Sequence, residues 1–272
     1  MTVPYDRIVL ELIGRSVDQD ETDTMLNPNL APLGHYTFAR LNEVLADCPP
    51  RVNEPPILFS LGEPQKPTPS ILAETIAAHD DQWNRYPPPI GDEAFRDAVV
   101  GWLHRRFDLP EGFVDPARNV VPVPGTREPL YQIGFLCTPP EKAGKRPAVL
   151  MPNPFYHVYQ GAAMVGGGEP VYLPAHAENN FLPVLEDLDE DLLARTALFF
   201  LCTPANPQGT TASADYLKRA IELARDAAVA FDLEPILSTG TQVDRKDIFI
   251  QHIVECTDTC HRATRENTCR IG

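Results

Sequence analysis

The feature that most constrains the fold is a short apolar run that leads directly into a proline-rich turn. Residues 196–201 (TALFFL) are apolar after the first position, and the turn CTPANPQG follows at residues 202–209. A short, continuous apolar run is typical of a strand buried on both faces of a parallel sheet. Residues 215–225 then show the period of a helix. The polar Asn206 therefore lies at the carboxyl end of a predicted strand, where open α/β sheets bind ligands, although Asn-Pro and Gln-Gly are also ordinary turn dipeptides.

The same alternation of apolar strands and amphipathic helices extends along most of the chain. We predict helices over residues 35–48, 69–79, 91–107, from 126, from 156, near 185–194 and over 215–225. We predict strands over residues 57–61, 120–123, 148–151, 170–173 and 196–201, with residues 227–231 as a further candidate. Strands that alternate with helices indicate βαβ units, so the fold class is α/β with a mostly parallel sheet flanked by helices.

Composition excludes several classes of function. The chain has 272 residues, of which 43% are hydrophobic, so it can form a substantial core. No apolar run approaches the length of a transmembrane helix, and the N-terminus shows no secretory signal, so we expect a cytoplasmic protein. The net charge of −15 argues against nucleic acid or an anionic membrane as the main partner.

The cysteines do not predict a metal site. Three of the six are scattered through the body of the chain, as reduced, buried thiols usually are, and three fall between residues 256 and 269. With His252 and His261 the latter group could suggest zinc. There is no C-x-x-C pair, however, so we expect no metal.

A turn before the predicted helix at residue 126 has the features of an anion site. Gly125 lets the backbone approach a ligand, Thr126 adds a hydroxyl, and the helix start offers free N–H groups and the positive end of its dipole. The patterns G-x-x-x-x-G-K-[ST] and G-x-G-x-x-G are both absent, so one phosphate fits better than a chain of them.

Three further turns could contribute side chains to the same site. Tyr86 lies on a stiff proline loop and could donate to a phosphate oxygen, and Gly62 begins a tight turn. Tyr156 follows a predicted strand and could stack on a flat heterocycle, unless it and its aromatic neighbours belong to the core. A phosphate cup, an aromatic platform and the Asn206 amide would together suit a flat, singly phosphorylated ring, and pyridoxal phosphate is such a molecule.

These motifs resemble those of the class I/II aminotransferases, the fold type I family of pyridoxal-phosphate enzymes. Within that family the chain is most similar to the proteobacterial N-succinyldiaminopimelate aminotransferases of lysine biosynthesis. The resemblance covers about residues 25–225. It rests on the order and spacing of NP at 27–28, GEP at 62–64, RYPPP at 85–89, PGTRE at 124–128, MPNPFY at 151–156 and TPANPQG at 203–209.

The resemblance implies a role for each motif. Asn206 would donate to the ring oxygen of pyridoxal 5′-phosphate, Tyr156 would stack on the pyridine, and the backbone of residues 125–127, with Thr126 and Arg127, would hold the phosphate. Tyr86 would reach across a homodimer interface to the partner's phosphate. Gly62 would lie beside the substrate carboxylate. The implied reaction is transamination of an amino acid with 2-oxoglutarate and glutamate as the second pair.

The chain departs from the family after about residue 225. The aspartate that holds the pyridine nitrogen protonated has two candidates, Asp232 and, second, Glu234. The lysine that forms the Schiff base is not found, because Lys246, the only lysine after Lys218, is flanked by acids that favour its charged form. The catalytic residue is therefore unknown, and we expect little or no transaminase activity.

We expect four segments along the chain. Residues 1–24 read as an acidic extension outside the family, 25–60 as the N-terminal arm and part of a small domain, 61–232 as an incomplete cofactor-binding large domain, and 233–272 as an aberrant tail. A truncated or frame-shifted copy of an aminotransferase fits this pattern best. The alternatives are a non-catalytic cofactor-binding or interaction protein and a fragment of a pyridoxal-phosphate lyase.

Overall fold

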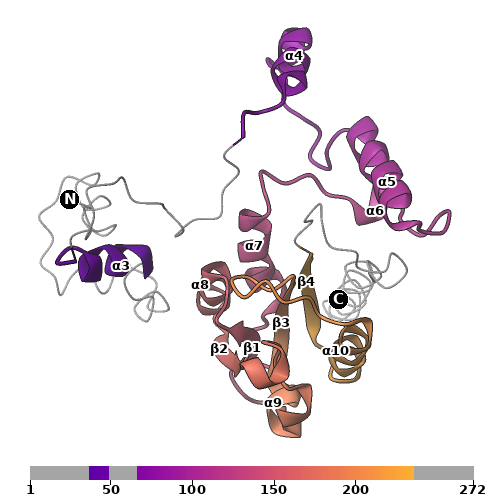
Figure 1. Cartoon of the computed structure of the whole chain (residues 1–272). Helices are drawn as coiled ribbons and strands as arrows, with labels where there is room; N and C mark the ends of the chain where they lie inside the picture. Colours follow the sequence, from indigo (N-terminus) through magenta and orange to yellow (C-terminus); the bar gives the residue numbers. More distant parts are fainter. Residues whose placement is uncertain (1–36, 49–65, 236–272) are drawn as a thin grey trace, which may run out of the picture.

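The computed structural model describes residues 37–48 and 66–235, and its centre is a parallel sheet of four strands (Figure 1). The strands are β1 (Ala148–Asn153), β2 (Glu169–Pro174), β3 (Thr196–Thr203) and β4 (Ala230–Pro235). They lie in the order β2-β1-β3-β4, and every neighbouring pair is parallel. The predicted α/β class with a mostly parallel sheet is confirmed.

The two central strands are buried on both faces, as their unbroken apolar sequences predict. Alternate side chains of β1 and β3 point to opposite faces of the sheet. Ala148, Leu150, Phe199 and Leu201 pack in one core cluster. The intervening residues Val149, Met151, Leu198 and Phe200 pack in the other. The sheet therefore has a hydrophobic core on each side.

Helices cover each of these two faces (Figure 1). On one side, α7 (Arg127–Cys137) and α8 (His157–Val165) pack against the cluster that contains Val149 and Phe200. On the other side lies α10 (Ala214–Asp226), whose buried residues are Leu217, Ala220, Ile221 and Ala224, the face predicted from the sequence. The short helix α9 (Glu190–Arg195) contributes Leu192 to the same side.

Helices α7 and α8 meet at a position that only glycine can occupy without a shift. A Cβ added to Gly134 would lie 2.3 Å from the carbonyl oxygen of Ala162, and one added to Gly166 would lie 2.4 Å from that of Gly134. The two helix backbones therefore approach each other closely. This contact fixes how α7 and α8 cross above the sheet.

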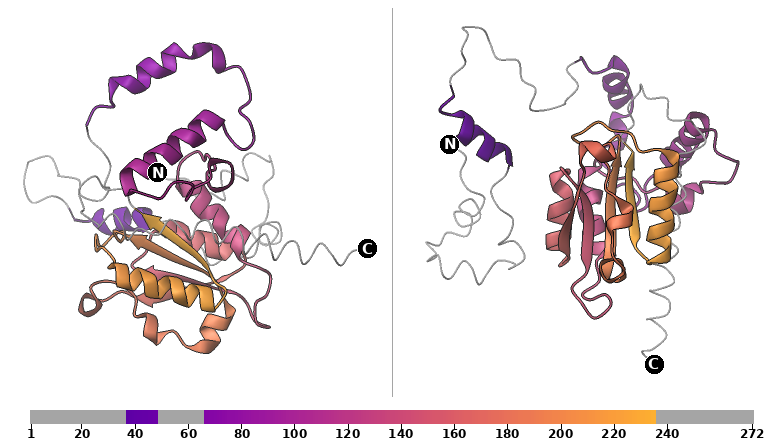
Figure 2. Two further views of the ribbon diagram at one scale, coloured as in Figure 1. Left: turned by 90° about the vertical axis from the view of Figure 1, so that its right-hand side faces the viewer. Right: turned by 60° about the horizontal axis from the view of Figure 1, so that its bottom comes forward.

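The remaining helices lie outside this layered unit (Figure 2). They are α3 (Thr37–Leu45), α4 (Ser70–Ala78), α5 (Glu93–Phe107) and α6 (Pro116–Asn119), with a 3-10 turn at Asp80–Gln82. Two further 3-10 turns, Ala177–Asn179 and Leu185–Asp187, belong to the sheet unit, where Leu185 is part of a core cluster. The helices predicted over 35–48, 69–79 and 91–107 are thus present. Their apolar faces are not buried, however: Phe95 is 50% exposed and Trp102 39%.

Three predicted elements differ from the structure. Residues 120–123 form no strand, because no described strand pairs with them, and Val121 is 69% exposed. The helix predicted near 185–194 is interrupted, since the Asp189 carboxylate accepts a hydrogen bond from the Leu192 amide and starts α9 anew. The last strand begins at Ala230 rather than at residue 227. The strand predicted at 57–61 lies outside the described residues.

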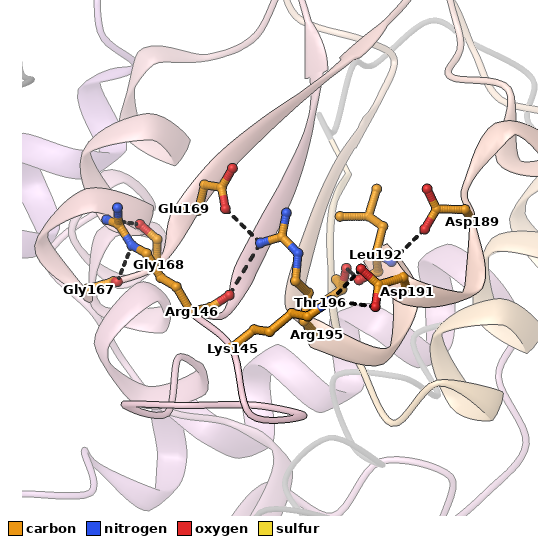
Figure 3. A network of polar contacts seen from close by, with 10 residues as sticks. All are labelled: Lys145, Arg146, Gly167, Gly168, Glu169, Asp189, Asp191, Leu192, Arg195 and Thr196. Atoms are coloured by element: carbon orange, nitrogen blue, oxygen red, sulfur yellow. Dashed lines mark hydrogen bonds and ion pairs between the residues drawn. The ribbon is translucent and has the colours of Figure 1, made fainter.

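A polar network joins the elements at the amino end of the strands (Figure 3). The Arg195 guanidinium donates to Glu169 at 2.7 Å and to the carbonyl oxygen of Arg146 at 3.2 Å. Nearby, the Lys142 ammonium donates to the carbonyl oxygens of Thr196 at 2.5 Å and Ala228 at 2.8 Å. These contacts hold the amino ends of β2, β3 and β4 together, which leaves the opposite edge of the sheet for ligand binding.

Candidate active site

The candidate site lies at the carboxyl edge of the sheet, where β1 and β3 end side by side. Because the two strands are parallel neighbours, the turn that follows Asn153 and the turn that follows Thr203 are adjacent. The amino terminus of α7 reaches the same edge, since its first residue Arg127 contacts Tyr156. The structure thus brings together three of the turns singled out in the sequence.

The start of α7 offers an anion site, as the sequence predicts. Thr126 precedes the helix, and no side chain caps the helix at that point. By contrast, side chains cap α5, α6, α9 and α10, through Asp92, Asp115, Asp189 and Ser213. Gly125 has a φ of +109°, a conformation that favours glycine. Like α4 and α8, α7 thus begins without a capping hydrogen bond from its N-cap side chain, and this leaves backbone N–H groups at the positive end of its dipole for a ligand.

Arg127 connects this helix start to the aromatic platform. Its Nε donates to the Tyr156 hydroxyl at 3.1 Å, across 29 residues of sequence. The neighbouring His157 has a pKa below its ordinary value, because burial, and secondly the charge of Arg127, disfavour its protonated form. A guanidinium and a helix amino terminus thus converge on one edge of the Tyr156 ring.

Tyr156 packs against an aromatic ring that is itself stacked in the core. Its ring stands at 86° to that of Tyr159, with centroids 5.8 Å apart. Tyr159 in turn stacks on Phe200 of β3 at 4.5 Å and 9°. Tyr159 is core, at 1% exposed, whereas Tyr156 is half-buried. The sequence left open whether Tyr156 and its aromatic neighbours belong to the core. Tyr159 does pack in the core, whereas Tyr156 keeps a surface that a ligand can reach.

The turn that carries Asn206 is closed by its own backbone. The Ala205 amide donates to the carbonyl oxygen of Thr210 at 2.7 Å, and the Gly209 amide donates back to that of Ala205 at 2.6 Å. The Asn206 side chain is exposed at this edge. The amide of Gln208 crosses to the neighbouring turn and donates to the carbonyl oxygen of Pro154 at 3.1 Å.

The structure describes the remaining predicted site residues only in part. Tyr86 is 100% exposed and packs against nothing in the described part of the chain. Asp232 lies on β4, with its backbone opposite Phe200. Gly62 lies outside the described residues, as does Lys246.

The described ranges 37–48 and 66–235 contain four lysines, two of which lie at the amino edge of the sheet. Lys142 and Lys145 lie at the amino edge, where Lys145 pairs with Asp191 at 2.6 Å. Lys218 is on the outer surface of α10, and Lys66 precedes α4. Those ranges also contain no cluster of three or more His, Cys, Asp or Glu side chains that could hold a metal ion. None of their helices combines the length and apolar character needed to cross a bilayer.

The sequence did not indicate one contributor to the site, Gln208, or one contact of another, Arg127. The motif at residues 125–127 indicated mainly a role for their backbone, whereas the Arg127 side chain also contacts the tyrosine. Gln208 stood out only as part of a turn. The charge of Arg127 beside a helix start was a usable signal. The contact of Gln208 left no signal in the sequence, because its partner is a backbone carbonyl 54 residues away.

Comparison with known proteins identifies the family. The family model "Aminotransferase class I and II" matches residues 54–232. The LL-diaminopimelate aminotransferase of Moorella thermoacetica is 33% identical over 192 residues, which cover 70% of this chain and 47% of that protein. That of Dehalococcoides mccartyi is 31% identical over 201 residues, covering 73% and 50%. The chain belongs to the class I and II aminotransferases.

Solved structures agree with this assignment. An aminotransferase from Neisseria meningitidis superposes with a TM-score of 0.71 at 32% identity, covering 76% of this chain and 52% of that one. A probable N-succinyldiaminopimelate aminotransferase from Thermus thermophilus, at 22% identity and a TM-score of 0.57, covers 65% of this chain and 46% of that one and shows the fold alone. The chain spans about half the length of the curated relatives it matches.

Proposed function

We propose that this chain is the cofactor-binding portion of a pyridoxal-phosphate-dependent aminotransferase that acts on a diaminopimelate-type amino acid in lysine biosynthesis. The observation that carries the proposal is the meeting of three groups at one edge of the sheet. These are the uncapped start of α7, the Tyr156 platform and the turn with Asn206. The names of the relatives support diaminopimelate as the substrate class, whereas the succinylated form rests on the sequence resemblance alone.

The residues present fit the cofactor. The backbone N–H groups at residues 125–127 and the Thr126 hydroxyl would hold the phosphate, and Arg127 would add a positive charge. Tyr156 would lie against one face of the ring, and the Asn206 amide would donate to the ring oxygen. A Cβ at Gly125 would meet only Glu128, at 3.6 Å, so the approach to the helix start is open. When bound, the cofactor withdraws electrons from the substrate α-carbon.

Three roles of the family remain proposals for particular residues. Asp232 would face the ring nitrogen and keep it protonated, with Glu234 as the alternative. Tyr86, on its exposed loop, would reach the phosphate of a second copy in a homodimer, and Gly62 would lie beside the substrate carboxylate. Lys142 and Lys145 lie at the opposite edge of the sheet and Lys218 pairs with Asp215 on α10, so we assign the transfer of the substrate α-proton to none of them. We therefore propose that the chain binds the cofactor and transaminates little or not at all.

A direct assay tests both halves of this proposal. The full chain is incubated with pyridoxal 5′-phosphate, 2-oxoglutarate and LL-diaminopimelate or its N-succinyl derivative, and glutamate is measured. The LL-diaminopimelate aminotransferase of Moorella thermoacetica, assayed alongside with LL-diaminopimelate, controls for the reagents. We expect bound cofactor after gel filtration but no glutamate above a blank without protein. Glutamate formation would contradict the inactivity, and loss of all cofactor on gel filtration would contradict the cofactor site.

A non-catalytic cofactor-binding or interaction protein is the second candidate. The placement of Lys142 and Lys145 at the opposite edge of the sheet favours it. It predicts the same cofactor binding but no turnover, even when a lysine-bearing aminotransferase chain is supplied to complete the site. Turnover under that condition would favour the enzyme reading.

A further inference from the structure

One side chain joins the two turns that form the candidate cofactor site. The Nε2 of Gln208 donates to the carbonyl oxygen of Pro154 at 3.1 Å. Gln208 belongs to the turn after β3, and Pro154 to the turn after β1. The contact lies two residues from Asn206 along one turn and two residues from Tyr156 along the other.

The two turns differ in how well each is fixed by its own contacts. The turn after β3 is closed by the paired backbone bonds of Ala205, and the Ala212 amide donates to the Thr203 hydroxyl at 3.0 Å where the turn rejoins the chain. These bonds make the turn a single closed unit at the end of β3. Across the space between the turns, Gln208 is the side chain that holds this unit against the turn bearing Tyr156.

The orientation of the Gln208 amide is determined by its partner. The Pro154 carbonyl can only accept, so the nitrogen end of the amide must face it. The oxygen end, Oε1, is buried and has no partner among the described residues. A buried acceptor without a partner is unfavourable, so the side chain is held there by what its nitrogen does and not by a saturated network.

We propose that Gln208 is a positioning residue for the cofactor, and that it sets the separation between the Asn206 amide and the Tyr156 ring. This inference rests on the proposed function. A flat ring held by Tyr156 on its face and by Asn206 at its edge requires both groups at one fixed spacing. Freeing the turn after β3 would leave both side chains present but would let their spacing vary, and binding would then lose the benefit of a preformed site.

The test compares two Gln208 variants with a matched control. Gln208→Ala removes the side chain, while Gln208→Glu keeps its length but cannot donate to Pro154 when ionised. Arg219→Ala is the control, because the Arg219 guanidinium likewise makes a long-range hydrogen bond, at 2.6 Å to Glu186, and lies on α10, outside the two turns. The probe is pyridoxamine 5′-phosphate, which lacks an aldehyde that could react with surface lysines. Its fluorescence on titration with the full-length variants gives Kd.

We expect both Gln208 variants to raise Kd about three- to tenfold, the effect of losing one hydrogen bond, and the control to stay within twofold. Hydrogen exchange without ligand provides a second measurement. In Gln208→Ala, amides of both turns, residues 153–156 and 203–209, should exchange faster, although they lie far apart in the sequence. In Arg219→Ala they should not.

The outcomes separate failure of this inference from failure of the proposed function. If the wild-type chain binds the probe and the Gln208 variants bind it equally well, the positioning role is wrong even if their Tm falls. Faster exchange in the turn after β3 alone would also overturn it. If the wild-type chain does not bind the probe, the proposed function fails and the role of Gln208 in cofactor binding fails with it.

Discussion

His157 is the residue whose ionisation reports most directly on the candidate site. It begins α8 beside the Tyr156 ring, at a centroid distance of 4.9 Å, and it senses the charge of Arg127. Its pKa is lowered from 6.5, firstly by burial and secondly by Arg127. Its neutral form is thus favoured in the folded chain. As pH falls below 6.5 towards the lowered folded pKa, the unfolded state takes up the proton first, and this residue's contribution to stability is lost.

A histidine titration by NMR tests this electrostatic arrangement. The signal of His157, assigned with His157→Gln, should titrate with a pKa below 6.5. In Arg127→Met the pKa should rise but remain below the ordinary value, because the burial persists. An unchanged pKa in Arg127→Met would show that the guanidinium does not act on this residue.

Phe200 is the residue on which the aromatic platform rests. It is 0% exposed and stacks on Tyr159. Phe200→Ala should lower the free energy of unfolding by about 3–5 kcal/mol, through the lost apolar burial and the cavity left behind. Phe95→Ala, at a side chain 50% exposed, should lower it by less than about 1 kcal/mol. Urea denaturation measures both values, and similar losses would contradict the assignment of the core.

At the scale of elements, the packing of α7 on α8 determines where the start of α7 lies. The two backbones approach at Gly134, and the Arg127 end of α7 reaches Tyr156 from there. The sheet contributes the ends of β1 and β3, so the site depends on one helix crossing and one strand pairing.

Two glycine-to-alanine substitutions separate the effect of this close crossing on stability from the effect of helix propensity. Alanine is favoured over glycine in helices by about 1 kcal/mol. Gly134→Ala should nevertheless destabilise the chain by about 1–3 kcal/mol, because its Cβ would lie 2.3 Å from the Ala162 oxygen. Gly101→Ala in α5 should stabilise it by up to about 1 kcal/mol, since its Cβ would meet only the flexible end of Arg105 at 3.2 Å. Thermal unfolding with matched baselines provides the comparison, and a more stable Gly134→Ala would refute the close crossing.

The elements that the sequence predicts well are those whose signal is local. The apolar runs of β1 and β3 and the amphipathic face of α10 are fixed by residues next to one another in the chain. Residues 120–123 look equally strand-like, but a strand also requires a neighbour, and none of the described strands pairs with them. Asn206 and Tyr156 were found through turn motifs, whereas Gln208 acts through a partner that no motif includes.

At the scale of the whole molecule, the sheet unit is well packed while other elements expose apolar side chains. On α4 and α5 the exposed fractions reach 64% for Ile71, 54% for Ile76 and 50% for Phe95. Monomeric proteins rarely expose large contiguous apolar patches. We therefore expect the chain to associate with itself at concentrations where a typical monomer does not.

Sedimentation velocity across a range of concentrations tests this expectation. The wild-type chain should sediment faster as its concentration rises. Glutamate substitutions at Ile76 and Phe95 should weaken that dependence. Glutamate substitutions at the exposed polar residues His79 and Gln82 add similar charge without removing apolar surface and should leave it unchanged. Monomeric wild-type behaviour at all concentrations would contradict the expectation.

The central claim is that the ends of β1 and β3 and the start of α7 form one binding site for a flat, singly phosphorylated ring. Its most direct test is the Kd of pyridoxamine 5′-phosphate for the full-length chain and for Tyr156→Ala and Asn206→Ala, with inorganic phosphate as competitor. We predict saturable binding that inorganic phosphate displaces. Each substitution should weaken this binding, and the lost stacking in Tyr156→Ala should raise the Kd by about tenfold or more. No saturable binding, or binding that neither substitution weakens, would contradict it.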